Sequence, residues 1–199
     1  YPQGWKSPRH YLRIVPQLAT SYKWSADNKS LELKLRSGVT FHDGEKFDAA
    51  AVKYNLERHK DMKGSNRRGE LAVMSSVDVV DPSTVRINLA APFAPLLAVL
   101  TDRSGMMVSP KAAEAAGEKF AANPVCSGPF KFVERVAQDR IALERYDGYW
   151  NKAQVHFDKV TYTPAMRFHL RGGAEPTLVL PGFKPIADEG QSPHGSDVV

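Results

Sequence analysis

The chain has 199 residues, and its 27 basic against 22 acidic side chains leave a net charge of +5. This length allows one or two domains with a hydrophobic core, and 42% apolar with 25% charged residues is an ordinary globular composition. A chain disordered throughout is therefore excluded. The longest apolar block, residues 90–100, contains two prolines and is too short to span a membrane. The single cysteine, Cys126, excludes an internal disulfide framework and a cysteine-based zinc site.

The N-terminal part predicts a hairpin followed by a helix. Residues 1–18 contain three prolines with little periodicity, so we expect them to be irregular. Strands are predicted at 21–24 and 30–36, because leucine alternates with charged side chains in the second of them. A helix is predicted at 49–61, with Asp48 as its N-cap.

The middle of the chain predicts shorter elements. Alternation of apolar and polar residues indicates strands, and Ser109 followed by Pro110 is typical of a helix start. In chain order, we expect a short helix at 69–74, strands at 77–80 and 84–90, a helix at 92–100, a strand at 106–108 and a helix at 110–116.

The last predicted elements are a hairpin at 130–136 and 140–146 and a strand at 157–163. After Pro164 the sequence becomes rich in glycine and proline, and only residues 177–180 favour a strand there. Strands in hairpin order with few short helices predict an α+β fold rather than alternating βαβ units.

No catalytic or metal-binding motif is present in the sequence, and we expect no cofactor. His42 and Asp43 are adjacent, but neighbouring side chains rarely converge on one substrate atom, and the Asp43-Gly44 pair is a turn signal. A hydrolase that uses His42, Asp43 and a serine is kept as one alternative. Cys126 lies near no obvious base and is expected to be an inert, partly buried side chain.

Basic residues are most dense in the stretch that begins at Lys53 and ends at Arg68. Tyr54 is the single aromatic residue among them, whereas nucleic-acid binding favours basic residues interleaved with several aromatic ones. We expect a solvated surface without a nucleic-acid partner, and keep a basic interaction module as the second alternative.

Three groups of residues together resemble a known family. They are Pro-Gln-Leu-Ala-Thr-Ser-Tyr-Lys-Trp at 16–24, Leu-Glu-Leu-Lys-Leu-Arg-Ser-Gly-Val-Thr-Phe-His-Asp-Gly at 31–44, and the later set of Asn123-Pro124, Ser127-Gly128-Pro129-Phe130, Tyr149-Trp150 and Phe157-Asp158-Lys159-Val160. In order and spacing this set is similar to the dipeptide/oligopeptide class of extracellular solute-binding proteins, family 5, of bacterial ABC importers.

The resemblance implies a lobe of a class II periplasmic binding protein, with a mixed or antiparallel sheet and short helices. It implies capture of peptides or peptide-like solutes in the periplasm, or at a lipid anchor in a Gram-positive source, and delivery to a membrane permease without chemical reaction. The N-terminus carries no signal segment, so an export signal would already have been removed.

The resemblance covers residues 15–164 and implies three regions. Residues 1–14 are an irregular lead-in, 15–164 belong to the first lobe and its subdomain, and 165–199 are an atypical tail. Because the family's second lobe is not recognisable, we expect a fragment with weak or no independent binding. Its exposed inter-lobe face favours self-association.

Loop position selects the candidate ligand contacts, because binding residues concentrate on loops held by a rigid scaffold. Arg103 is a charged residue in a polar loop between two apolar elements, although an ion pair with Asp102 or a plain surface charge is the more ordinary explanation. The candidates for the ligand cleft are Asp102, Arg103, Ser104, Gly105, Ser127 and Gly128.

Overall fold

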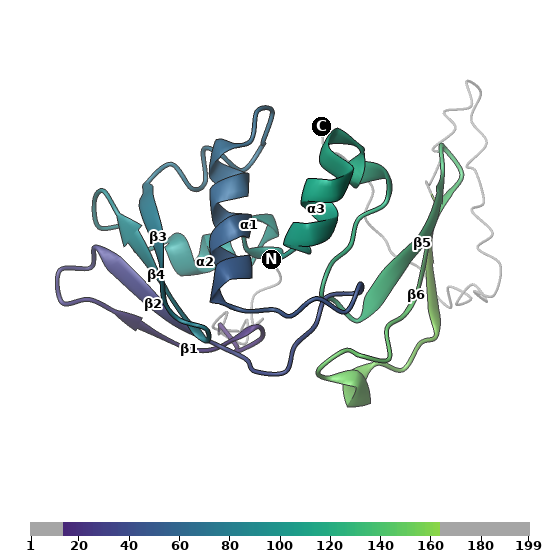
Figure 1. Cartoon of the computed structure of the whole chain (residues 1–199), viewed down its shortest axis with the longest axis horizontal. Helices are drawn as coiled ribbons and strands as arrows, with labels where there is room; N and C mark the ends of the chain where they lie inside the picture. Colours follow the sequence, from purple (N-terminus) through teal and green to yellow (C-terminus); the bar gives the residue numbers. More distant parts are fainter. Residues whose placement is uncertain (1–13, 164–199) are drawn as a thin grey trace, which may run out of the picture. The chain divides into compact units, whose positions relative to one another are not determined.

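The computed structural model describes residues 14–163. Residues 1–13 of the lead-in predicted at 1–14, the tail at 165–199 and the strand expected at 177–180 lie outside the described residues. The described part is α+β, with two antiparallel sheets and short helices, as the sequence predicts (Figure 1). Its elements are β1 (Ala19–Trp24), β2 (Ser30–Leu35), α1 (Ala49–Asp61), β3 (Met74–Asp81), β4 (Thr84–Leu89), α2 (Leu96–Leu100), η1 (Arg103–Gly105), α3 (Pro110–Ala116), η2 (Gly117–Ala122), β5 (Phe130–Val136), β6 (Arg140–Arg145), η3 (Lys152–Gln154) and β7 (Lys159–Tyr162).

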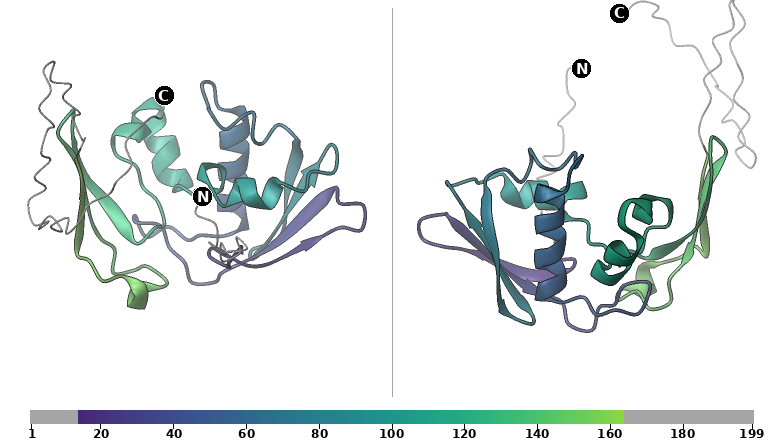
Figure 2. Two further views of the ribbon diagram at one scale, coloured as in Figure 1. Left: turned by 180° about the vertical axis from the view of Figure 1, so that it is seen from behind. Right: turned by 45° about the horizontal axis from the view of Figure 1, so that its top comes forward.

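The first sheet has the strand order β1-β2-β4-β3 and carries the core. Its alternating residues point to one face, where Leu31 pairs with Ile87 and Leu33 with Val85 across the β2–β4 ladder. Helix α1 packs against β3 and β4 on this face and adds Val52 and Leu56 to the core (Figure 2). The predicted alternation therefore selected the buried face, because a one-residue slip of the register would turn these leucines to solvent.

Both predicted helix caps are present. The Asp48 carboxylate accepts the backbone N–H of Ala51 at 2.9 Å, so α1 begins at residue 49. The Ser109 hydroxyl accepts the N–H of Ala112 at 3.3 Å, and Pro110 occupies the first position of α3.

Three predictions for the middle of the chain were wrong. Residues 69–73 form turns rather than a helix, because Met74 already pairs with Leu89 as the start of β3. The helix predicted at 92–100 is confined to α2, because Pro95 at its N-cap position disfavours helical backbone angles at the residue before it. The strand predicted at 106–108 is a single bridge between Val108 and Cys126.

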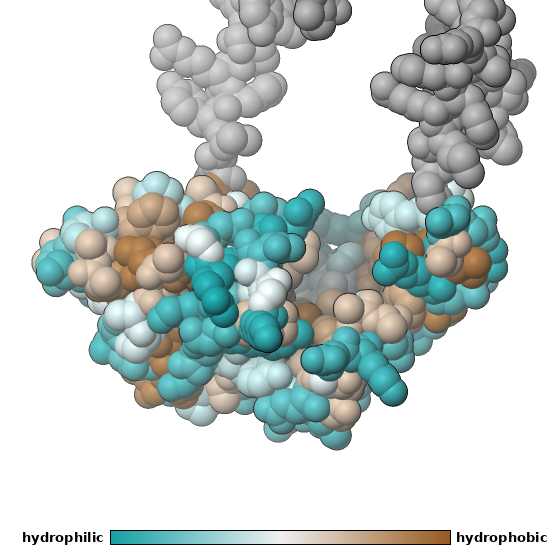
Figure 3. Space-filling model, turned by 90° about the horizontal axis from the view of Figure 1, so that it is seen from above, coloured by the Kyte–Doolittle hydropathy of each residue, from teal (hydrophilic) through white to brown (hydrophobic). Residues whose placement is uncertain are grey.

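The second sheet, in the order β5-β6-β7, confirms the predicted C-terminal hairpin and strand, with β7 shorter than expected. Gln138 adopts a left-handed φ of 62° in the β5–β6 turn. None of its strand residues is fully buried, and apolar side chains such as Ile141 and Tyr162 are exposed. Hydrophobic patches also interrupt the hydrophilic surface on the face that Figure 3 shows.

Candidate functional site

The turn at 102–105 places two charged side chains outside and one hydroxyl inside. Asp102 and Arg103 are exposed, whereas Ser104 is fully buried and donates its hydroxyl hydrogen to the carboxylate of Glu70. A Cβ atom on Gly105 would lie 1.9 Å from the carbonyl oxygen of Leu100, so only glycine fits at this position. Within the described residues Arg103 forms no ion pair, and the alternative pairing with Asp102 is not observed there.

Helix α1 holds the segment that follows this turn. Asn55 is fully buried and forms two reciprocal hydrogen bonds with the backbone of Val108, each 2.9 Å long. The His59 ring nitrogen Nε2 lies 3.1 Å from the carbonyl oxygen of Met106. Sequence reasoning missed Asn55, although a polar residue beside Leu56 on the apolar face of a predicted helix was the available signal.

The loop at 127–128 is anchored to the preceding motif. Ser127 is buried, and the Gly128 carbonyl oxygen lies 3.0 Å from Nε2 of His42. Because Val108 bridges to Cys126, the Cα atoms of Gly105 and Ser127 are separated by no more than about 20 Å. One short bridge thus links the segment that follows the first candidate loop to the segment that precedes the second.

His42 has a structural environment. Its backbone N–H donates to the Cys126 carbonyl at 2.8 Å, and the Cys126 N–H donates to Nδ1 at 3.4 Å. With Nδ1 as acceptor, the proton lies on Nε2, which donates to Gly128. Burial is the largest influence on this ring and lowers the pKa of His42, so the neutral form is favoured. The Tyr146 ring packs against it edge-on, with 4.9 Å between ring centroids.

Asp43 points to a different partner. Its Oδ2 accepts the hydroxyl hydrogen of Ser109 at 2.6 Å, and Ser109 is fully buried at the start of α3. His42 and Asp43 therefore do not converge, and the nearest serine to Asp43 is inaccessible to a substrate. Burial raises the pKa of the Cys126 thiol, which disfavours a reactive thiolate. The hydrolase alternative finds no support in this geometry.

The basic stretch from Lys53 to Arg68 is engaged in local contacts. Lys53 pairs with Glu57 at 3.7 Å, and Arg67 pairs with Glu70 at 2.5 Å. Arg68 donates to the carbonyl oxygens of residues 60, 61 and 62, which closes the C-terminus of α1. Lys53, Arg67 and Arg68 are thus held by contacts within the protein.

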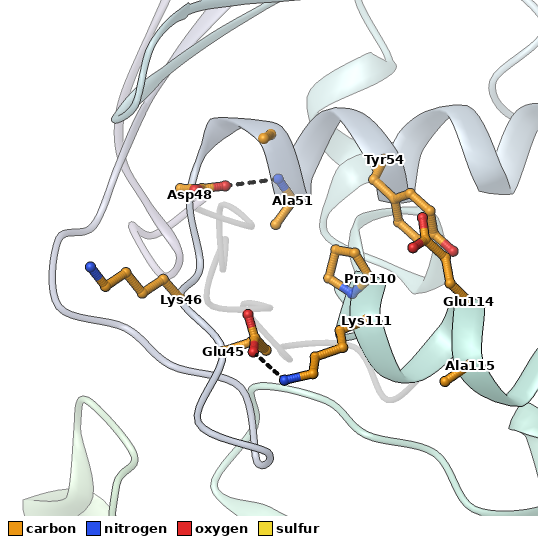
Figure 4. A pocket seen from close by; sticks show the side chains of 10 residues that line it. Glu45, Lys46, Asp48, Ala51, Tyr54, Pro110, Lys111, Glu114 and Ala115 are labelled. Carbon is orange, nitrogen blue, oxygen red and sulfur yellow. Dashed lines mark hydrogen bonds and ion pairs between the residues drawn. The ribbon is translucent and has the colours of Figure 1, made fainter.

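An open pocket of about 660 Å³ lies between α1 and α3, away from the predicted site residues (Figure 4). Alanine methyl groups form part of its lining, and a Lys111–Glu45 ion pair of 2.8 Å spans the gap between α3 and the loop before α1. Burial and the nearby carboxylate of Glu114 raise the pKa of Tyr54 in this pocket. Among residues 14–163 no cluster of side chains could hold a metal ion, and no helix there has the length and apolarity of a membrane span.

A comparison with protein families covers the whole of the described part of the chain. The sequence profile of the bacterial extracellular solute-binding proteins, family 5 (middle), matches residues 13–166. The glutathione-binding protein GsiB of Pectobacterium atrosepticum is 35% identical over 156 residues, which is 78% of this chain and 30% of the relative. GsiB of Escherichia coli K12 is 34% identical over 154 residues, or 77% of this chain. The chain thus spans about 30% of the length of these relatives.

Solved structures agree with this assignment. AgaA of A. tumefaciens R10, in complex with agropinic acid, superposes with a TM-score of 0.70 and 33% identity over 75% of this chain and 30% of its own. NikZ of Campylobacter jejuni, in complex with Ni(L-His), superposes with a TM-score of 0.67 and 29% identity. The match covers 73% of this chain and 30% of NikZ. The periplasmic-binding-protein fold predicted from the sequence is confirmed for this part of the chain, and with it the family: this is a bacterial extracellular solute-binding protein of family 5.

Proposed function

We propose that the chain is the substrate-binding component of an ABC importer, and that it captures peptides or peptide-like solutes in the periplasm for delivery to a membrane permease. Two of the similar proteins are named for glutathione, and the similar structures hold agropinic acid and a nickel–histidine complex. A carboxylate group is common to glutathione, agropinic acid and L-histidine. The same relatives support binding without chemical conversion.

The observation that carries the proposal is that Arg103 is exposed on a turn whose next residue, Ser104, is buried and hydrogen-bonded to Glu70. A guanidinium group presents several donors in a plane and pairs well with a carboxylate. We assign side-chain contact with the ligand to the exposed Asp102 and Arg103, and backbone contact to Ser104, Gly105, Ser127 and Gly128, because the side chains of Ser104 and Ser127 are buried. Backbone groups of the glycines and serines would supply the polar contacts that orient a small solute.

Affinity should be low for this chain by itself. A small-molecule site usually encloses about 70–90% of its ligand, and two loops on one lobe enclose far less. We propose that residues 15–164 provide first-lobe and subdomain surfaces, so the two loops would form one wall of a cleft. Dissociation constants in the millimolar range correspond to only about 4 kcal/mol of binding free energy.

Self-association through an exposed apolar face is a further part of this proposal. Ile141 and Tyr162 are exposed on neighbouring strands and pair across the β6–β7 ladder, so they share one face of the sheet. Sedimentation of the wild type and of Ile141→Glu at several concentrations tests it. A concentration-dependent dimer that the substitution abolishes is expected, and a monomer at every concentration would exclude it.

The binding proposal is tested by nuclear magnetic resonance titration of the ¹⁵N-labelled 199-residue chain with glutathione, a tripeptide and agropinic acid. We expect at least one solute to shift the amide signals of residues 102–105 and 127–128, with a dissociation constant of about 0.1–10 mM. Arg103→Ala should weaken this binding, whereas Arg135→Ala, on exposed strand β5, is the matched control. Absence of shifts at about 10 mM, or chemical conversion of the solute, would refute the proposal.

A further inference from the structure

A short chain of polar contacts connects the turns before β3 to the turn that carries Arg103. Nη1 of Arg67 lies 2.5 Å from Oε1 of Glu70, and the other carboxylate oxygen of Glu70 accepts the hydroxyl hydrogen of Ser104. The Arg67 and Glu70 side chains are 21% and 36% exposed, so this chain runs from the surface to a fully buried hydroxyl. It joins segments 34 residues apart in the sequence.

Ser104 is the inward-pointing side chain of its turn. The turn is closed by the Gly105 N–H, which donates to the Asp102 carbonyl at 2.9 Å, and Asp102 itself makes no capping hydrogen bond through its side chain. Lateral placement of the turn therefore depends on Ser104 and on the close packing of Gly105 against Leu100. Because Arg103 precedes Ser104 directly, the anchor that holds Ser104 also sets where the Arg103 side chain begins.

Charge balance within this chain of contacts bears on Arg103 as well. Asp102 belongs to the turn itself, and Glu70 reaches it from another segment with partners on both of its carboxylate oxygens. Among residues 14–163 no carboxylate forms an ion pair with Arg103, so its guanidinium is available to an anionic partner from solution.

We propose that Glu70 is a positioning residue for ligand binding: through Ser104 it holds the turn at 102–105, so that Arg103 meets an anionic group of the solute, in the first instance a carboxylate. This inference rests on the proposed function for its ligand, while the positioning itself is a property of the free protein. Glu70 does not touch the solute. Its effect on affinity passes through Arg103.

The test uses the full chain with glutathione as the probe, and compares Glu70→Ala and Ser104→Ala with wild type. Glu57→Ala is the matched control, because it removes an exposed glutamate of α1 that pairs with Lys53 at 3.7 Å. We expect each of the two test substitutions to weaken glutathione binding about five- to tenfold, and the control to leave it unchanged. Glu70→Gln, which keeps the side-chain shape and an acceptor for Ser104, should fall between Glu70→Ala and wild type.

A double-mutant cycle separates positioning from a general structural role. In the Arg103→Ala background, Glu70→Ala should have no further effect on the affinity for glutathione. An equal loss in both backgrounds, or no loss in wild type, would overturn the proposal. Circular dichroism verifies that each variant is folded.

A ligand-free measurement keeps this proposal distinct from the proposed function. Backbone relaxation of the amides of residues 103–105 should show increased mobility in Glu70→Ala and Ser104→Ala, but not in Glu57→Ala. If no solute binds to any form, the proposed function fails, and this mobility alone decides the positioning: an increase supports it, and unchanged relaxation overturns it.

Discussion

Nε2 of His42 lies 3.0 Å from the carbonyl oxygen of Gly128, 86 residues further along the chain. This hydrogen bond attaches the His-Asp-Gly turn before α1 to one of the two candidate ligand loops. The Tyr146 hydroxyl reinforces the same junction, since it donates to the Phe41 carbonyl at 3.0 Å. The motif that most strongly identifies the family therefore positions backbone rather than contacting a solute through its charges.

The neutral state of His42 predicts that stability depends on pH. Burial lowers the pKa of His42 below its ordinary value of 6.5, despite the opposing influence of the Gly128 carbonyl and Asp43. The unfolded chain then binds a proton at a higher pH than the folded chain, which favours unfolding. The contribution of His42 is thus complete above pH 6.5 and is lost as the pH falls from 6.5 through the folded-state pKa.

Urea denaturation of the wild type and of His42→Gln, between about pH 5 and pH 8, measures this effect. The wild type should lose more stability than His42→Gln on acidification across this range. His156→Gln, at an exposed position, is the control and should behave as the wild type. Identical pH profiles for wild type and His42→Gln would contradict the assignment of a neutral, buried imidazole.

The close packing of Gly105 predicts that Gly105→Ala lowers the free energy of unfolding far more than Gly69→Ala does. In Gly105→Ala the new methyl group would overlap the Leu100 carbonyl at 1.9 Å, so the turn must move. We expect a loss of about 1–3 kcal/mol in the free energy of unfolding. At Gly69 nothing lies within 4 Å of the added methyl, and Gly69→Ala should be neutral or slightly stabilising. Equal effects in chemical denaturation would show that the turn is not tightly packed.

The buried side chain of Asn55 predicts a loss of stability when its hydrogen bonds to Val108 are removed. Asn55→Ala removes both hydrogen bonds to Val108 and leaves its backbone N–H and carbonyl without that partner. The expected loss is about 2–3 kcal/mol, and the amides of residues 106–108 should exchange faster with solvent. Asn88→Ala is the control, because Asn88 makes its side-chain hydrogen bonds on an exposed face of β4. An equal, small loss of unfolding free energy for both variants would contradict a stabilising role of the Asn55–Val108 hydrogen bonds.

Local patterns in the sequence were sufficient for most of the described fold. Strand β2, the capped helix α1 and the Ser109-Pro110 start of α3 each carry their signal within a few residues. The helix predicted at 69–74 was wrong although Leu71 and Met74 are both buried at a helical spacing. Met74 instead pairs with Leu89 of β4 as part of the sheet. Tertiary pairing overrides local spacing in such a case.

The candidate site was harder to anticipate because its supports are distant in sequence. Arg103 could be selected from its loop position, but the Glu70–Ser104 contact joins residues 34 apart and Asn55–Val108 joins residues 53 apart. Neither pair carries a spacing that one sequence reveals. The roles of His42 and Asp43 likewise became distinct only when each side chain was seen with its own partner.

The measurement that tests the central claim most directly is paramagnetic broadening of the amide signals of this chain by a nitroxide-labelled tripeptide. Signals of residues 102–105 and 127–128 should be broadened first, and unlabelled glutathione should restore them. Arg103→Ala should reduce the broadening, and Arg135→Ala should not. Broadening centred on the basic stretch from Lys53 to Arg68, or on no defined region, would contradict a solute-binding site at these two loops.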